Sequence, residues 1–362
     1  MKLEHPVNKK KRPAADRDGP AGGQIRRPAQ EPMCTSTGCI EYAPERYRNR
    51  DIDIIRIHLF FKGKEYLEGL NLDPVELYMR MEDVKDTKND LPHTAIPTYA
   101  EVAAHFQKAI EDGYSEVIVI VLSSFLGGTW NFISLVAKDF EKKIKIHVID
   151  SKISCFPEGY LAIKAKDFAD AGMPTEKILK ELDWIKAHQQ LIGVDGKLDY
   201  LIYNGRLKGG KAYLGKMISL CPVIYFNREG ELAPLTNAIG ETAALKKSCQ
   251  YLQKILYGRS PRDYILYHVY TGPSLLKRLK IVEEKFGIVT NHEDVIMPDK
   301  IEEIYSSFKD KNVYNGVGLK NVYQRLKVYF GEKAEVKIES VLDEGTTITL
   351  LIPVKERKIN EE

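Results

Sequence analysis

The sequence predicts an α/β protein with a parallel β-sheet that helices cover on both faces. The first observation is the run from Val117 to Leu122, whose six apolar residues are mostly β-branched, as in a strand buried on both sides. The second is the alternation of strand-like and helix-like segments over 51–188, which is the rhythm of βαβ units. The third is the Ser-Ser-Phe-Leu-Gly-Gly-Thr turn at 123–129, which leads from this strand into a helix.

Each element of the first half follows from its local pattern. Residues 51–61 are strand-like, and Asp73 with Pro74 supplies the cap and first turn of a short helix. Amphipathic spacing predicts a helix over 98–112 that ends at Gly113. The remaining elements alternate in the same way and are strands at 116–122 and 145–149 and helices at 128–140, 157–171 and 174–188.

The pattern changes after Leu191, where a hairpin and longer helices replace the strand-helix alternation. The hairpin turns at Glu229-Gly230. The expected elements are strands at 192–195, 222–227, 231–236 and 263–269 and helices at 240–256 and 273–286. We therefore predict a first α/β domain at 34–190 and a second, smaller α/β domain at 191–295. The cleft between two such domains is a natural ligand site.

Both ends of the chain differ from these domains. Residues 1–33 are basic and rich in proline, without hydrophobic periodicity, and we expect a disordered leader. No apolar core follows its run of lysines, so it does not resemble a signal peptide. Residues 296–362 predict a short α+β appendage that contains a hairpin with strands at 335–340 and 346–353.

Composition excludes several classes of protein. The chain of 362 residues is 43% hydrophobic and 29% charged with a net charge of +3, which does not indicate a nucleic-acid binder. The apolar runs are shorter than the ~20 residues of a membrane-spanning helix. The five cysteines are scattered and lack zinc-type spacing, so we expect reduced thiols, no metal and a cytoplasmic location.

The turn at 123–129 is a candidate binding site. Ser123, Ser124 and Thr129 supply hydroxyl groups beside the free N–H groups of a helix start, where an anionic group is favoured. Gly127 and Gly128 allow a tight turn and a close approach of the backbone to a ligand. These residues predict a site for a small acidic group, either a carboxylate or a phosphate.

Over about residues 36–287 the chain resembles the DegV family of bacterial fatty-acid-binding proteins. The resemblance depends on motifs that occur in the family's order. They are Glu65-Tyr66-x-x-Gly69 with Asp73-Pro74 and Glu76-Leu77-Tyr78, Thr94-Ala-Ile-Pro97-Thr98, Ser123-Ser124-Phe-Leu-Gly127-Gly128-Thr129, Val148-Ile149-Asp150-Ser151-Lys152, and Leu198-x-Tyr200-Leu201-x-x-x-Gly205-Arg206-Leu207.

The resemblance implies a carrier without catalytic residues or a cofactor. It implies that a long-chain fatty acid lies between the two domains, with Thr94 and Ser124 holding its carboxylate. Ser123, Gly127, Gly128 and Thr129 would shape the loop. Some members of the family present the acid to a separate fatty-acid kinase, and Arg206 resembles an arginine near that docking surface. Catalysis by Ser124 is not expected, since the chain lacks a Gly-x-Ser-x-Gly elbow.

The chain departs from the family's pattern in three places. The opening Asp-Ser-Thr-x-Asp-Leu motif is Thr35-Ser36-Thr37-Gly38-Cys39-Ile40 here, so both acids are missing. The usual Thr-Ser pair is Thr94-Ala95. The final His-x-Gly-Pro-Gly loop is absent, and we do not expect His268, at an earlier strand, to replace it. We interpret His93, His105 and His268 as ordinary polar or packed residues.

The tail from 314 to 353 resembles the end of a GHKL-type histidine-kinase ATPase domain. The motif is Gly316-Val-Gly318-Leu-x-Asn321-x-x-x-Arg325-Leu, followed by Phe330-Gly331 and Gly345-Thr346-Thr347. The family's segments for Mg²⁺ and adenine are not found upstream. The alternatives to a fatty-acid carrier are therefore an ATP-binding relative of sensor kinases and a degenerate fusion without a ligand.

Overall fold

We describe the protein from a computed structural model. It describes residues 29–48, 50–71, 77, 81, 91–194, 199–207, 209, 220–261, 263–270, 273–288, 295–296, 335–341 and 345–351. Among these residues, none of the helices combines the length and the apolar character that a bilayer span needs. The predicted helix at Asp73-Pro74 and the glycine motif at Gly316 and Gly318 lie outside the described residues.

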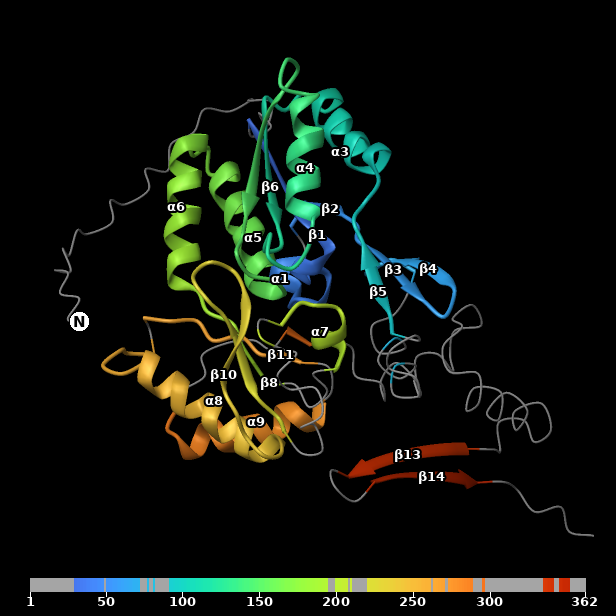
Figure 1. Cartoon of the computed structure of the whole chain (residues 1–362), viewed down its shortest axis with the longest axis vertical. Helices are drawn as coiled ribbons and strands as arrows, with labels where there is room; N and C mark the ends of the chain where they lie inside the picture. Colours follow the sequence, from blue (N-terminus) through green and yellow to red (C-terminus); the bar gives the residue numbers. More distant parts are fainter. Residues whose placement is uncertain are drawn as a thin grey trace, which may run out of the picture.

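The main sheet is parallel, as the sequence predicts. Its strand order is β2-β1-β6-β7, and every neighbouring pair is parallel. The strands are β1 (Gln30–Thr35), β2 (Asp53–Ile55), β6 (Glu116–Val121) and β7 (Lys145–Asp150). Figure 1 shows the sheet in the upper part of the molecule, with the second domain below it.

Strand β1 corrects the prediction of a disordered leader over 1–33. The strand begins at Gln30, and all six of its residues are buried between β2 and β6. This strand has no clear signal in the local sequence, because Glu31 and Pro32 interrupt the apolar pattern and proline is unusual in a central strand. Residues 30–33 were therefore wrongly predicted as part of the leader.

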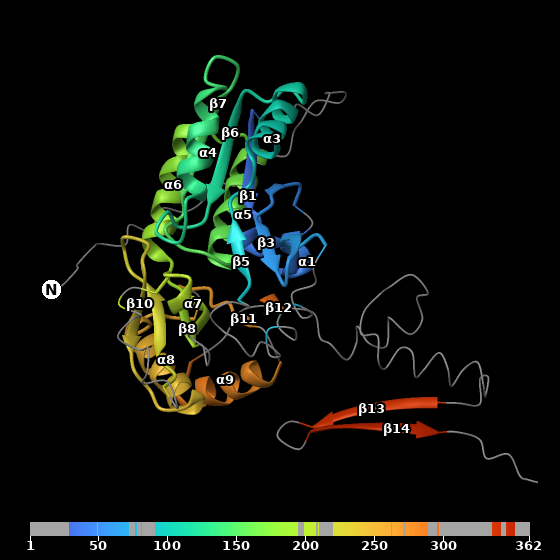
Figure 2. The same ribbon diagram turned by 45° about the vertical axis from the view of Figure 1, so that its right-hand side comes forward.

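Helices cover both faces of this sheet. One face carries α3 (Tyr99–Glu111) and α4 (Thr129–Lys138), and the other carries α5 (Phe156–Asp170) and α6 (Thr175–His188), as Figures 1 and 2 show. Strand β6 packs against the helices on both faces because its side chains point alternately to the two sides of the sheet. Val119 packs in the cluster with α3 and α4, whereas Ile118 and Ile120 pack with α5 and α6. The burial of each such side chain contributes about 2 kcal/mol.

The strand-like segment 51–61 divides between two sheets. Its first part is β2, and its second part, β3 (His58–Phe61), joins an antiparallel sheet in the order β4-β3-β5. The other strands of this sheet are β4 (Lys64–Leu67) and β5 (His93–Ala95). The prediction of one strand was wrong. The break between β2 and β3 has no local signal, because neither Arg56 nor Ile57 is a turn-forming glycine or proline. This sheet positions Thr94, which lies in β5 opposite Leu59.

The second domain contains an antiparallel sheet with two long helices. The predicted hairpin is confirmed, and the strand order is β10-β9-β8. The predicted strand at 263–269 is reduced to a two-residue strand that pairs with β12. The elements are β8 (Ile192–Val194), α7 (Asp199–Tyr203), β9 (Val223–Phe226), β10 (Leu232–Thr236), α8 (Glu241–Ile255), β11 (Val269–Tyr270), α9 (Pro273–Lys285) and β12 (Val295–Ile296).

Short elements and the tail complete the described structure. The segment after β1 forms η1 (Ser36–Gly38), η2 (Ile40–Tyr42) and α1 (Glu45–Arg48). In the tail, β13 (Glu335–Val341) and β14 (Gly345–Leu351) form the antiparallel hairpin that the sequence predicts. The domain boundaries at 190 and 295 stay predictions.

Candidate functional site

The candidate site lies where the parallel strands of the main sheet end. Ser123 and Ser124 follow β6, and Asp150 is the last residue of the neighbouring strand β7. The carboxyl ends of parallel strands meet at one edge of a sheet, and this edge is where ligands of open α/β sheets bind. The edge faces the second domain (Figure 1).

Ser124 is held by Asp150. The Ser124 hydroxyl donates a hydrogen bond to Asp150 Oδ2 at 2.7 Å, and its backbone N–H donates to Oδ1 at 3.3 Å. The N–H of Lys152 also donates to Oδ1, at 2.8 Å. Since a serine hydroxyl has one proton and two lone pairs, Ser124 keeps acceptor capacity, and it can donate to a ligand only by turning away from Asp150.

Ser123 forms a contact between the domains. Its side chain is fully buried, and its hydroxyl donates to the carbonyl oxygen of Gly230 at 2.6 Å. Gly230 lies in the turn between β9 and β10 with φ of +97°, and a Cβ there would lie 2.5 Å from Ser123 Oγ. The hydroxyl that the sequence predicts as part of the binding loop therefore joins that loop to the hairpin.

Arg206 connects Thr94 to the serine loop. Its Nη2 donates to Thr94 Oγ1 at 3.1 Å, and its Nε donates to the carbonyl oxygen of Leu126 at 3.2 Å. Burial lowers the pKa of Arg206, yet a guanidinium stays charged in proteins. Within the described part of the chain, no carboxylate forms an ion pair with Arg206. A guanidinium without a carboxylate partner among the described residues thus lies between the two predicted head-group loops.

The glycines of the turn leave space beside it. A Cβ on Gly127 or Gly128 would meet no heavy atom within 4 Å, and neither residue has a positive φ. The turn therefore does not require glycine conformations, and the glycines instead leave the backbone open. Thr129 is buried at the first position of α4, and Gly128 caps this helix without a side-chain hydrogen bond. Its first N–H groups are therefore not taken by a cap side chain, as the sequence predicts for an anion site.

An apolar cluster built from side chains of both domains lies next to these loops. Ile153, which accepts a hydrogen bond from Ser123 N at 2.8 Å, and Leu126 belong to the first domain. The second domain contributes Ile202, Leu207, Ile224, Phe226 and Leu232. The arrangement places polar loops with one cation against an apolar region, which is the combination that an amphipathic acid requires.

The remaining sequence-predicted positions have structural partners. His268 is buried and bonds to Glu283 Oε1 at 2.9 Å within the second domain. His93 stacks on Phe60, and His105 bonds to Asp53 at 2.8 Å. These contacts agree with the interpretation of the three histidines as ordinary polar or packed residues, which stays a prediction.

The opening motif contacts a buried acid that was not identified from the sequence. Glu158 in α5 is fully buried, and its carboxyl accepts hydrogen bonds from Thr35 at 2.5 Å and Thr37 at 2.9 and 3.0 Å. Burial raises the pKa of Glu158 well above its ordinary value, although the hydrogen bonds from Thr35 and Thr37 oppose the change. Its signal in the sequence was a glutamate among the apolar residues of a helix with little amphipathic character.

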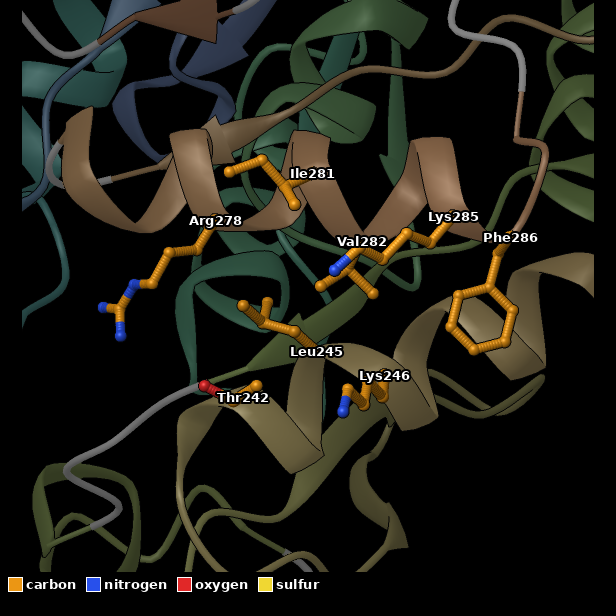
Figure 3. A pocket seen from close by; sticks show the side chains of 8 residues that line it. All are labelled: Thr242, Leu245, Lys246, Arg278, Ile281, Val282, Lys285 and Phe286. Carbon is orange, nitrogen blue, oxygen red and sulfur yellow. The ribbon is translucent and has the colours of Figure 1, made fainter.

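A separate groove lies between α8 and α9, with a volume of about 210 Å³ (Figure 3). Its apolar lining includes Leu245 and Val282, and its cations come from both helices. The sequence-predicted site residues do not line this groove, so it is distinct from the site at the sheet edge. No group of three or more histidine, cysteine or acidic side chains suited to a metal ion occurs among the residues that the structure describes.

The comparisons with known proteins decide the family. The family model described as "Uncharacterised protein, DegV family" matches residues 34–296. This chain belongs to the DegV family. A DegV domain-containing protein of Listeria monocytogenes is 28% identical over 264 residues, which is 72% of this chain and 90% of that protein.

Solved structures of fatty-acid-binding proteins share the fold. A fatty acid binding DegV family protein from Streptococcus agalactiae has a TM-score of 0.63 at 23% identity, covering 73% of this chain and 90% of that one. A stearic acid-binding protein from Eubacterium ventriosum has a TM-score of 0.62 at 22% identity, covering 76% and 94%. At these identities the likeness establishes the α/β fold, and the ligands named are those of the relatives.

Proposed function

We propose that this DegV family protein binds one long-chain fatty acid at the sheet edge. The carboxylate lies between Thr94, Ser124 and Arg206, and the tail follows the apolar cluster between the domains. The observation that carries the proposal is Arg206, whose guanidinium touches both predicted head-group loops. Solved relatives described as fatty-acid-binding support the same class of ligand.

The energetics favour an acid with a long tail. A carboxylate brought close to Asp150 is repelled by that charge and needs a cation to offset it, which Arg206 supplies. Each charge-assisted hydrogen bond contributes about 1.5–3 kcal/mol. Each buried methylene adds about 0.8 kcal/mol, so affinity should rise with chain length until the apolar region is filled.

The test uses the full chain purified from a bacterial host. We expect native mass spectrometry and organic extraction to detect a co-purified long-chain acid, and the delipidated protein to take up oleate or palmitate. Ser124→Ala, Thr94→Val and Arg206→Met should each weaken uptake about 10-fold or more, from the loss of one hydrogen bond to a charged group.

The control is Ser115→Ala. Ser115 precedes β6 at its opposite end and donates to the carbonyl oxygen of Ala29 at 3.0 Å, so this variant removes a hydroxyl away from the site. Uptake should stay at the wild-type level. If the three site variants bind oleate like the control, the head-group assignment is wrong. A delipidated wild type that takes up no acid would contradict the function itself.

The acid is carried for use by a partner rather than transformed by this chain. Three large apolar side chains near the site, Ile96, Phe125 and Tyr203, are 40%, 56% and 46% exposed. Such surfaces suit a protein partner, and the partner we propose is a fatty-acid kinase subunit. Phe125→Ser should leave oleate uptake intact and slow the kinase-dependent phosphorylation of the bound acid. Equal phosphorylation in both proteins would argue against this docking surface.

A further inference from the structure

Two cysteines from distant parts of the chain meet beside the start of α5. Cys39 lies between η1 and η2, and Cys155 is the residue that caps α5. Their side chains are in contact, and the Cys39 thiol donates to the carbonyl oxygen of Thr37 at 3.5 Å. Both are partly exposed, whereas Cys34, Cys221 and Cys249 are buried. The fatty-acid site uses neither thiol.

Close packing of the backbone fixes this contact. Gly38 and Gly159, next to the two segments, lie so near each other that a Cβ on Gly159 would be 2.1 Å from the Gly38 carbonyl oxygen. A Cβ on Gly38 would be 2.6 Å from the sulfur of Cys34. The loop is therefore pressed onto the first turn of α5, and the approach of Cys39 to Cys155 does not depend on flexible side chains.

Both cysteines occupy backbone conformations that favour glycine. Cys39 has φ of 53° and ψ of 24°, in the left-handed region, and Cys155 has φ of 59° and ψ of −156°, a region used almost only by glycine. Strained conformations persist where the surrounding structure enforces them, and they gather at functional sites. Two such residues in contact, both cysteine, are unlike the other cysteines of the described chain.

The surroundings give the two thiols different roles. The contact with Cys39 lowers the pKa of Cys155, although burial and the carboxyl group of Glu68 oppose the change. Cys155 also lies at the N-terminus of a 15-residue helix. The contact with Cys155 raises the pKa of Cys39, and burial raises it further. The carboxyl groups of Glu68 and Glu158 face Cys39 and also raise its pKa. The place of Cys155 at the start of α5, where a negative charge is favoured, makes it the nucleophilic thiol and Cys39 the thiol that follows.

We propose that Cys39 and Cys155 form a redox-active dithiol that a hydroperoxide oxidises to a disulfide. The Cys155 thiolate attacks one peroxide oxygen, the O–O bond breaks, and a sulfenic acid forms with release of hydroxide, which takes up a proton to become water. Cys39 then attacks the Cys155 sulfur, the S–O bond breaks, and a second water leaves with the proton of Cys39. Two thiols are oxidised while one hydrogen peroxide is reduced to two waters.

The experiment uses the full-length protein, reduced and then freed of reductant. Hydrogen peroxide is added, remaining thiols are blocked with N-ethylmaleimide, and the digest is analysed by mass spectrometry. We expect a peptide pair joined through Cys39 and Cys155 as the main product, which dithiothreitol separates again. The buried thiols should be alkylated only after denaturation.

Variants separate the two roles without disturbing the fold. Cys39→Asn suits a left-handed position and should leave a sulfenic acid on Cys155 that dimedone labels. Cys155→Gly suits its glycine-like conformation and should abolish labelling at Cys39. Cys249→Ser, in the core of the second domain, is the control and should form the disulfide like the wild type. Melting by circular dichroism verifies each fold.

Two results would overturn the proposal. One is a folded wild type in which peroxide leaves Cys39 and Cys155 open to N-ethylmaleimide. The other is equal dimedone labelling of Cys39 in Cys155→Gly and of Cys155 in Cys39→Asn, which would mean that the thiols do not act as a pair. Neither readout depends on fatty-acid binding.

Discussion

At the scale of single residues, side chains at the start of α5 complete the opening motif. The chain departs from the DegV pattern at Thr35 and Cys39, where both acids are missing, and each of these residues contacts the start of α5. Thr35 donates to the buried Glu158, and Cys39 meets Cys155. The carboxyl group is thus supplied from a helix instead of from the loop. Pairings of this kind depend on the tertiary approach of two segments, which a local motif does not encode.

Glu31 predicts a pH dependence of stability. It is buried in β1, and its Oε2 has no hydrogen-bond partner among the described residues. Burial raises the pKa of Glu31 from 4.5 to about 7, with a smaller contribution from the nearby Asp51 and Asp53, while Tyr114 and Lys166 oppose the change. The folded state therefore holds a proton that the unfolded state loses between pH 4.5 and 7, so stability falls as the pH rises through this window.

The Glu31→Gln variant should remove this loss. Its free energy of unfolding relative to the wild type should increase between pH 4.5 and 7 by up to about 3 kcal/mol and then stay constant. Urea denaturation at a series of pH values measures the difference. Glu68 and Glu158 also have raised pKa values, but they remain in both proteins, so the comparison isolates Glu31. Parallel stability profiles for the two proteins would refute the assignment.

At the scale of elements, helices and the long strands could be predicted because their signals are local. The helix expected at 98–112 ends at the left-handed Gly113 that the pattern indicates, and the structure adds a cap at Thr98. Strand β1 could not be found, since its burial comes from neighbours on both sides rather than from its own composition. The hairpin of the tail was found, whereas the glycine motif before it lies outside the described residues, and nucleotide binding stays a prediction.

The capping box of α3 gives the prediction for this scale. Thr98 Oγ1 accepts from Glu101 N at 3.4 Å, and Glu101 Oε2 accepts from Thr98 N at 2.7 Å. Burial alone would raise the pKa of Glu101, but hydrogen bonds from Thr98 and His58 lower it to about 2. This stabilisation is present above pH 4.5 and is lost as the pH falls toward 2.

Removal of the cap should destabilise the protein. Thr98→Ala is expected to lower the free energy of unfolding at pH 7 by about 1 kcal/mol, measured by urea denaturation. Thr98→Ser keeps the hydroxyl and is the matched control, which should stay close to the wild type. An alanine variant as stable as the serine variant would show that the cap does not contribute.

At the scale of the whole molecule, the site could be predicted only in part. The hydroxyl loops follow from the turn after β6, but Asp150 and the position of Arg206 depend on how distant segments meet. Asp150 had a usable signal, because it ends a strand beside β6 and carboxyl ends of parallel strands share an edge. The sequence places Arg206 near a docking surface, but its position beside the head-group loops had no signal, since its contacts with Thr94 and Leu126 span both domains.

The contact of Ser123 with Gly230 gives the prediction for the joined domains. In Gly230→Ala, the new Cβ would lie 2.5 Å from Ser123 Oγ and 3.0 Å from Lys152 Cα, so the hairpin must move away from the serine loop. The buried hydroxyl of Ser123 then loses its acceptor, which costs about 1–3 kcal/mol. Gly258→Ala is the matched control, because Gly258 has φ of +74° with no heavy atom within 4 Å of an added Cβ. It carries the backbone strain without the clash.

We therefore expect Gly230→Ala to be less stable than Gly258→Ala by about 1–3 kcal/mol in urea denaturation. Oleate uptake should fall in Gly230→Ala and stay at the wild-type level in Gly258→Ala, since the hairpin and the serine loop enclose the apolar cluster together. Equal stability and equal uptake in the two variants would mean that this contact does not fix the hairpin against the serine loop. The serine loop would then form its site independently of the second domain.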